Sequence, residues 1–272
     1  MKFSKYYLLA SASGIALASG ANAADLPIKS PSFAAPPAPA SWAGWYVGIN
    51  GGVITNQTHV TDPHNWTDES YIGEFGTAKA TGGAIGGQIG YNWQDDAFVY
   101  GLEADIDWVS AKASNNSFNV CPGCTGPGGA GGGQTGVLQS NMEWLSTIRG
   151  RAGITVGRTQ GTLLYVTGGL ALAGIHSNWG LGYNTGAAIG RFNPNSFVSN
   201  GVKVGWTAGV GIEHMFASIP NWSFRAEALW IEFANDNVTV PGPSTFNGHV
   251  GPFPSQFQNQ SVLGRVGVNY RF

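Results

Sequence analysis

Three shortages limit what this 272-residue chain can be. Only 10% of its residues are charged, against about 25% in a typical soluble protein. These are too few charged side chains to cover the surface of a water-soluble protein of this size. Beyond residue 23 no run of about 18 apolar residues occurs, which excludes a bundle of membrane-spanning helices. The 13 basic residues do not outnumber the 15 acidic ones, and without a basic excess a nucleic-acid partner is excluded as well.

Glycine and aromatic residues are abundant instead. The chain has 42 glycines and 10 tryptophans, and aromatic residues make up 12% of it. The glycines show no period of three, so the sequence is not collagen-like. Many short strands of a closed barrel are the architecture that this composition favours.

The first residues have the pattern of an export signal. Lys2 and Lys5 precede a short apolar stretch, and Ala21-Asn22-Ala23 supplies a small-residue cleavage motif. The sequence predicts a signal peptide over residues 1–23, with an uncleaved anchor as the alternative. Residues 24–41, with five prolines, predict an extended periplasmic tether.

The rest of the chain, residues 42–272, alternates apolar with small or polar residues. Strand-length segments of this kind are 42–53, 80–93, 97–109, 144–157, 162–174, 204–216, 223–233 and 261–272. In residues 97–109 one face carries three carboxylates and the other carries Leu102, Ile106 and aromatic residues. A lipid-facing exterior with a polar lumen fits this split. A soluble sandwich or lipocalin-like barrel remains the alternative.

The connections alternate in length. Those at 54–79, 110–143, 175–203 and 234–260 are long, and the others are short. Tryptophans such as Trp108 and Trp206 lie near the long connections, whereas other aromatic residues lie near the short ones. Short periplasmic turns, long outer loops and two aromatic girdles predict an eight-stranded antiparallel outer-membrane β-barrel.

Several segments also resemble a known family. FVYGLEADIDW, WLSTIRGRAGIT and WTAGVGIEHMF, together with the other strands, resemble small outer-membrane β-barrels of the immunogenic surface-protein type, relatives of opacity proteins and of the OmpA barrel. The resemblance implies a surface-antigenic, structural or porin-like role in a Gram-negative envelope, and it brings no catalytic residues. It also implies that Tyr270 and Phe272 form a C-terminal assembly signal.

Ionisable residues on the inward parity are the main candidate site. They are Glu103, Asp105, Asp107, Arg149, Arg151, Glu213, Arg225, Glu227 and Arg265, with Arg271 at the exit. Eight strands enclose a lumen that side chains nearly fill, so near-equal opposite charges favour an ion-pair network that plugs it. On adjacent strands, Glu103 or Asp105 is expected near Arg149, and Glu213 near Arg225. A selectivity ring around a narrow water path is the alternative.

Two cysteines, Cys121 and Cys124, lie in the longest outer loop. Export to an oxidising compartment predicts that they form a small structural disulfide, with free thiols as the alternative.

The predicted function is therefore structural and interactive. An outer-membrane surface protein with long loops is the main hypothesis, and a porin-like channel for small solutes is the alternative. No nucleophile–base–orienter set is visible, so no enzyme activity is predicted, and neither a cofactor nor a metal is expected. The expected partners are outer-membrane lipid and lipopolysaccharide, the barrel-assembly machinery and periplasmic chaperones; the oligomeric state is not predicted.

Overall fold

Nine β-strands follow one another in the computed structural model, which describes residues 40–61, 74–121, 134–183, 197–246 and 249–272. The strands are β1 (Gly44–Thr61), β2 (Glu74–Asp95), β3 (Phe98–Cys121), β4 (Gln134–Val156), β5 (Thr162–Tyr183), β6 (Phe197–Met215), β7 (Trp222–Phe233), β8 (Asp236–Phe246) and β9 (His249–Arg271). No helix in these residues is long and apolar enough to cross a membrane.

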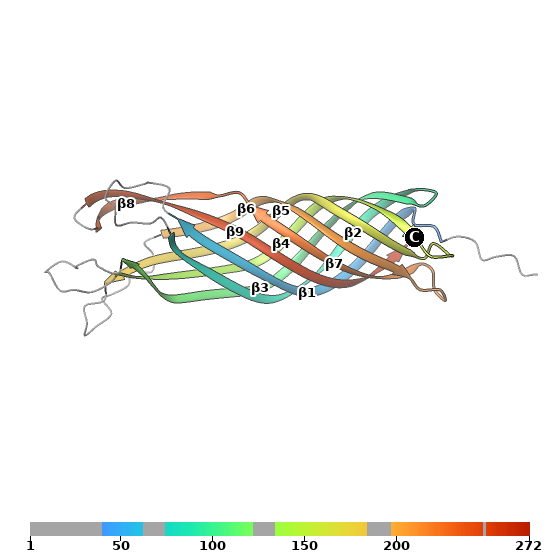
Figure 1. Cartoon of the computed structure of the whole chain (residues 1–272), viewed down its shortest axis with the longest axis horizontal. Coiled ribbons are helices and arrows are strands. Elements are labelled where there is room, and N and C mark those ends of the chain that lie inside the picture. Colours follow the sequence, from blue (N-terminus) through green and yellow to red (C-terminus); the bar gives the residue numbers. More distant parts are fainter. Residues whose placement is uncertain (1–39, 62–73, 122–133, 184–196, 247–248) are drawn as a thin grey trace, which may run out of the picture. The chain divides into compact units, whose positions relative to one another are not determined.

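The strands close into an antiparallel barrel with eight strand positions (Figure 1). β1 pairs with β2 on one side and with β9 on the other. β7 and β8 run one after the other along β9, because the β7 ladder ends with Glu232 opposite Gln260 and the β8 ladder begins with Asp236 opposite Phe257. β8 therefore continues the line of β7, and the predicted eight-stranded barrel is confirmed.

Short connections join the strands at one end of the barrel. They are residues 96–97, 157–161 and 216–221. Asp96, in the tightest of these turns, has a φ of 51°, a left-handed conformation that Asp tolerates better than most residues. Short turns at one end and longer connections at the other are the asymmetry of an outer-membrane barrel, whose short turns face the periplasm.

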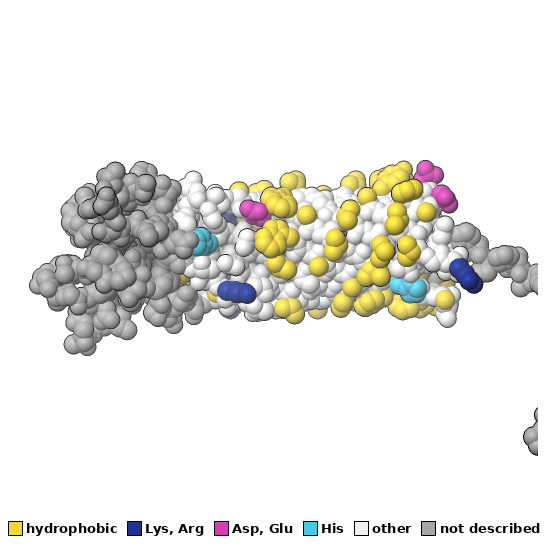
Figure 2. Space-filling view, in the orientation of Figure 1, with side chains coloured by type: hydrophobic (Ala, Val, Ile, Leu, Met, Phe, Trp, Pro, Cys, Tyr) yellow, Lys and Arg dark blue, Asp and Glu magenta, His cyan; other side chains and the backbone are white. Residues whose placement is uncertain are grey.

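The outer surface of the barrel is apolar between its two ends. Ile49, Ile85 and Leu102 have exposed fractions of 72%, 68% and 58%. In Figure 2, apolar side chains spread over the middle of this face, and charged side chains lie towards the two ends. Such a large exposed apolar surface matches the hydrocarbon core of a bilayer and not water.

Aromatic side chains form a girdle at each end of the apolar surface. In the lower girdle, at the short-turn end, Trp93 stacks on Tyr100 with ring centroids 5.7 Å apart, and Tyr270 contacts the edges of Trp222 and Phe272. The upper girdle includes Trp108, Trp144, Trp206 and Trp230. Their separation by the apolar surface corresponds to the two interfaces of the membrane.

The strands extend further beyond the upper girdle than the alternation predicts. β1 continues past its expected end at residue 53 to Thr61, and β3 continues past residue 109 to Cys121. The prediction that these stretches are loops is therefore wrong. Above the lipid, outward positions become polar, as at Gln57. Outward and inward residues then no longer differ in polarity, so the alternation that predicts a strand disappears. The backbone ladder continues regardless, for example with Thr58 opposite Asn259.

Candidate functional site

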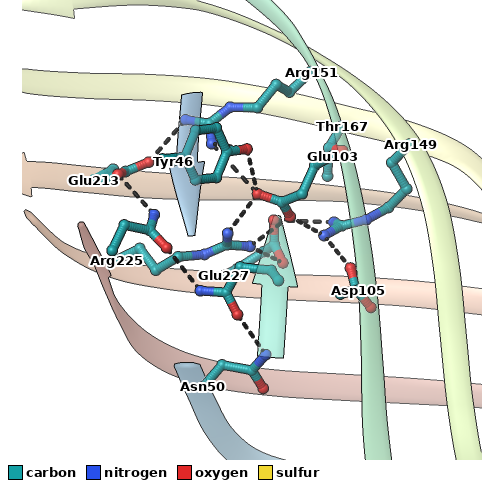
Figure 3. A network of polar contacts seen from close by, with 12 residues as sticks. Tyr46, Asn50, Glu103, Asp105, Arg149, Arg151, Thr167, Glu213, Arg225 and Glu227 are labelled. Carbon is teal, nitrogen blue, oxygen red and sulfur yellow. Dashed lines mark hydrogen bonds and ion pairs between the residues drawn. The ribbon is translucent and has the colours of Figure 1, made fainter. Parts of the chain in front are cut away.

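The barrel lumen contains a buried ionic network centred on Glu103, which projects inward from β3 (Figure 3). Tyr46 donates its hydroxyl to Glu103 Oε2 over 2.6 Å, and Arg149 Nη2 donates to Oε1 over 2.5 Å. Arg225 binds both oxygens of the same carboxylate, at 2.6 and 3.0 Å. A single carboxylate that is only 4% exposed thus accepts hydrogen bonds from side chains of β1, β4 and β7.

Two further carboxylates of β3 continue the network towards the outer side. Asp105 accepts hydrogen bonds from Arg149 at 2.8 Å, from Arg265 at 3.0 Å and from the Thr147 hydroxyl at 2.7 Å. Asp107 accepts one from Arg265 at 2.9 Å. The period of two along a strand places these acids on one face, where arginines from two other strands reach them.

Glu227 on β7 links three of the arginines. It accepts hydrogen bonds from Arg149 at 3.0 Å, from Arg225 at 2.8 Å and from Arg265 at 2.9 Å. Because Arg149 and Arg225 also hold Glu103, the two glutamates and the two arginines form a closed ring of charge-assisted hydrogen bonds across the lumen.

Glu213 on β6 has different partners from those that strand adjacency suggests. It lies directly opposite Arg225 in the ladder, as expected. However, its hydrogen bonds come from Arg151 at 2.8 Å, Ser223 at 2.5 Å and Asn269 at 2.9 Å. The guanidinium of Arg225 instead reaches Glu103 and Glu227. Arginine side chains are long enough to cross a narrow lumen, so ladder neighbours need not be ion-pair partners.

Opposite charges are balanced in this part of the lumen. Five carboxylates face five guanidinium groups if Arg271 is included, whose Nη2 lies 3.9 Å from Glu213. All ten side chains belong to buried residues. Burying charges carries a large desolvation cost that good pairing offsets only in part. The network is therefore not evidence of high stability in itself, but removing one member leaves an uncompensated charge.

Tyrosines that the sequence analysis did not single out complete the network. The ring of Tyr165 lies under Arg151, whose guanidinium carbon is 4.3 Å from the ring centroid, and its hydroxyl donates to Glu227 over 3.1 Å. Tyr46 also contacts Arg151, which donates to its hydroxyl over 3.0 Å. Strand parity alone would have placed Tyr46 and Tyr165 inside the barrel, since both share a face with small or polar residues.

Apolar side chains fill the lumen on the outer side of the charges. Fourteen buried residues form this apolar layer: Ile54, Ala80, Ala84, Val109, Ala111, Met142, Leu145, Ala171, Ala173, Ile175, Leu229, Ile231, Phe233 and Leu263. Beyond it lies a layer of hydroxyl and amide side chains, in which Thr58 bonds Ser140 at 2.9 Å and Asn259 at 2.7 Å. Two layers of side chains therefore fill the lumen on the outer side of the ionic network.

A segment before β1 covers the periplasmic side of the charges. Trp42 is fully buried, its indole N–H donates to the carbonyl of Gln160 over 2.9 Å, and its amide donates to Gln94 over 2.6 Å. Arg271 stacks on the indole, 4.7 Å from the ring centroid, and donates to the carbonyl of Ser41 over 3.0 Å. Trp42 was predicted to begin the first strand, but β1 begins at Gly44 and Trp42 closes the lumen instead.

A separate ionic contact lies above the membrane. Lys203 on β6 and Ser199 both donate hydrogen bonds to Asp236 at the start of β8. Partial burial tends to raise the pKa of Asp236, but the hydrogen bonds from Lys203 and Ser199 outweigh it, so the pKa lies below its ordinary value. The contact joins β6 to β8 where the ladder between β6 and β7 has ended at Gly205–Phe233.

The remaining predicted sites are the cysteine pair, the N-terminal segments and the C-terminal aromatic residues. Cys124 and the side chain of Cys121 lie outside the described residues, as do the signal peptide and all but the last two residues of the tether. Tyr270 lies in the lower girdle, and Phe272 is 74% exposed beside it. The amide of Phe272 donates to the Trp45 carbonyl over 3.1 Å, so the C-terminus completes the seam between β9 and β1.

A closed antiparallel barrel with an apolar exterior, two aromatic girdles and an ionic interior defines an integral outer-membrane β-barrel protein. This chain belongs to the family described as "Outer membrane protein beta-barrel domain", whose model matches residues 30–252. The predicted family and the outer-membrane location are therefore confirmed.

Two outer-membrane proteins of Brucella are similar to this chain over nearly their whole length. The 31 kDa outer-membrane immunogenic protein of Brucella melitensis is 32% identical over 274 residues, which cover 98% of this chain and 100% of the relative. The 25 kDa outer-membrane immunogenic protein of Brucella abortus is 26% identical and covers 92% and 95%. Among solved structures, the outer membrane protein OprG from Pseudomonas aeruginosa covers 85% of this chain and 97% of its own, with 13% identity and a TM-score of 0.43.

Proposed function

We propose that this protein is a non-enzymatic surface component of the envelope, in which a plugged barrel supports interactive segments outside the cell. One observation carries the proposal: the lumen is filled in successive layers. Trp42 covers its periplasmic side, the charge network crosses its middle, and the apolar layer lies above. An ion crossing the barrel would have to break buried ion pairs and then enter an apolar layer, which is costly.

The same packing supports a role in display. β1 continues from Val53 to Thr61, roughly 26 Å of strand at about 3.3 Å per residue, and a tilt near 40° reduces this to about 20 Å of height. Inside this extension, the Thr58 hydroxyl bonds both Ser140 and Asn259. The extension is a solid support that holds the outer connections away from the membrane. The relatives' names as immunogenic proteins agree with surface exposure.

A porin-like channel is the second candidate. In the described part of the chain, the buried Oδ1 atom of Asp105 has no hydrogen-bond partner. Such an oxygen atom is a suitable contact for a permeating cation. If the arginines around it moved, the acids of β3 would line a narrow cation path.

Single-channel recording decides between the two functions. The refolded full-length protein is inserted into a planar bilayer, and current is recorded in potassium chloride at several concentrations. The plugged barrel predicts no steady channels above the baseline of the empty bilayer. Steady openings that scale with salt concentration would overturn the proposal and establish the channel.

A further inference from the structure

A hollow of about 400 Å³ lies at β3, β4 and β5, and its lining includes exposed polar residues such as Gln139 and His176. Its lining combines one lysine, one histidine, three side-chain amides and two small residues: Lys112, Ala113, Gln139, Ser140, Asn141, His176 and Asn178. The ladders bring these residues together on three strands. Asn141 of β4 lies opposite Lys112 of β3 and His176 of β5, and Gln139 lies opposite Asn178. The hollow thus lies on the parts of β3, β4 and β5 that continue beyond the upper girdle.

The chemistry of the hollow favours hydroxyl groups. Each of the amides of Gln139, Asn141 and Asn178 offers two donors and an acceptor, which matches the vicinal hydroxyls of a sugar ring. Lys112 is the only permanently positive group of the lining. Glu143 lies beside the hollow, 3.6 Å from His176 and 3.3 Å from the amide of Asn141. Lys112 and Glu143 carry opposite charges, so hydrogen bonding by the amides, and not a net charge, would select the ligand.

An aromatic platform lies directly below the hollow. Trp108 of β3 and Trp144 of β4 are opposite each other in the ladder, and Trp108 is 65% exposed. The Trp144 indole lies over Gly174 of β5, where a Cβ atom would come within 2.4 Å of the ring nitrogen. Gly174 therefore allows the indole to lie against the sheet. An exposed indole beside hydrogen-bonding amides provides both an apolar face and polar contacts.

We propose that the hollow and the Trp108–Trp144 platform form a binding site for the saccharide of glycolipids in the surrounding outer leaflet. The upper girdle marks the membrane interface, so the hollow stands at the height of the glycolipid sugars. Amides bind the ring hydroxyls, and the indoles contact the apolar face of a sugar. The site adds a ligand class to the proposed interactive role. It rests on the proposed function in one respect, that the end with the long connections faces outside the cell, but it does not depend on the plugged lumen.

Nuclear magnetic resonance tests the site on the full-length protein refolded into phosphatidylcholine nanodiscs. The probe is the delipidated core oligosaccharide of rough-type lipopolysaccharide, and the side-chain amide signals are followed during the titration. We expect the signals of Gln139, Asn141 and Asn178 to shift saturably. Gln139→Ala combined with Asn178→Ala should weaken binding at least fivefold, and so should Trp108→Leu.

Gln258→Ala is the matched control, because Gln258 is an exposed amide on β9, four strand positions away from β4 around the barrel. Its binding should equal that of the unchanged protein. Absence of saturable shifts, or equal weakening in the control, would overturn the site. Equal binding of maltoheptaose, a soluble glucan, would overturn the glycolipid as its ligand. Binding by a barrel that also conducts would refute the plugged lumen and leave the saccharide site standing.

Discussion

Replacing Arg149 with methionine tests the ionic network directly. Arg149 is 1% exposed, and its guanidinium contacts Glu103, Asp105 and Glu227 within 3.0 Å. Methionine keeps most of the volume and removes the charge, so the change separates charge balance from packing. Five carboxylates would then face four guanidinium groups.

The expected loss of unfolding free energy follows from the contacts that survive. Arg225 still binds Glu103 and Glu227, and Arg265 still binds Asp105. No carboxylate loses every partner, but one buried negative charge is no longer balanced. Removing one member of a buried pair costs about 3–5 kcal/mol, and we expect a value in that range. A second change, Asp105→Asn, restores the balance, so the double variant should be more stable than Arg149→Met alone.

Urea unfolding in phospholipid vesicles, followed by tryptophan fluorescence, measures both variants. Arg158→Ala is the control, because Arg158 lies exposed in the turn between β4 and β5; it should change stability by less than about 0.5 kcal/mol. A loss below about 1 kcal/mol for Arg149→Met, or a double variant less stable than the single one, would refute the reasoning that paired charge fills the lumen.

Three further outcomes are expected. Val210→Arg, on the lipid face of β6, should cost about 2–4 kcal/mol in bilayers, whereas Asn200→Arg, on the same face above the girdle, should cost about 0–1 kcal/mol; equal costs would contradict the position of the membrane. Deleting Phe272 should lower outer-membrane levels and the heat-modifiable gel form, and unchanged levels would contradict an assembly role. Trp42→Ala should cost about 3–5 kcal/mol in urea unfolding, and a loss below about 1 kcal/mol would show that Trp42 does not seal the lumen.

Strand parity is the part of this fold that the sequence predicts well. Glu103 and Leu102 are neighbours in the chain, yet one is buried in the lumen and the other is 58% exposed. A period of two leaves only two choices for a strand, and three carboxylates on one face settle which choice lipid permits. The same logic locates Arg149 and Arg265 inside.

The pairing of the charges could not be predicted in the same way. Arg151 on β4 bonds Glu213 on β6, which is two strands away. Which carboxylate a guanidinium reaches depends on the width of the lumen and on the tyrosines around it, and neither quantity is a property of one strand. Trp42 escaped prediction for a related reason, because it lies outside the ladder and its role comes from where the segment before β1 turns.

The buried charges have a further consequence for how this chain specifies one barrel. A shift of β3 by one residue against its neighbours would move Glu103, Asp105 and Asp107 from the lumen to the lipid face. Carboxylates in hydrocarbon are costly, and the arginines of the lumen would lose their partners at the same time. An apolar lumen of equal volume would distinguish the two registers much less. We infer that the ten buried charged side chains separate the native register from its alternatives more than they add net stability.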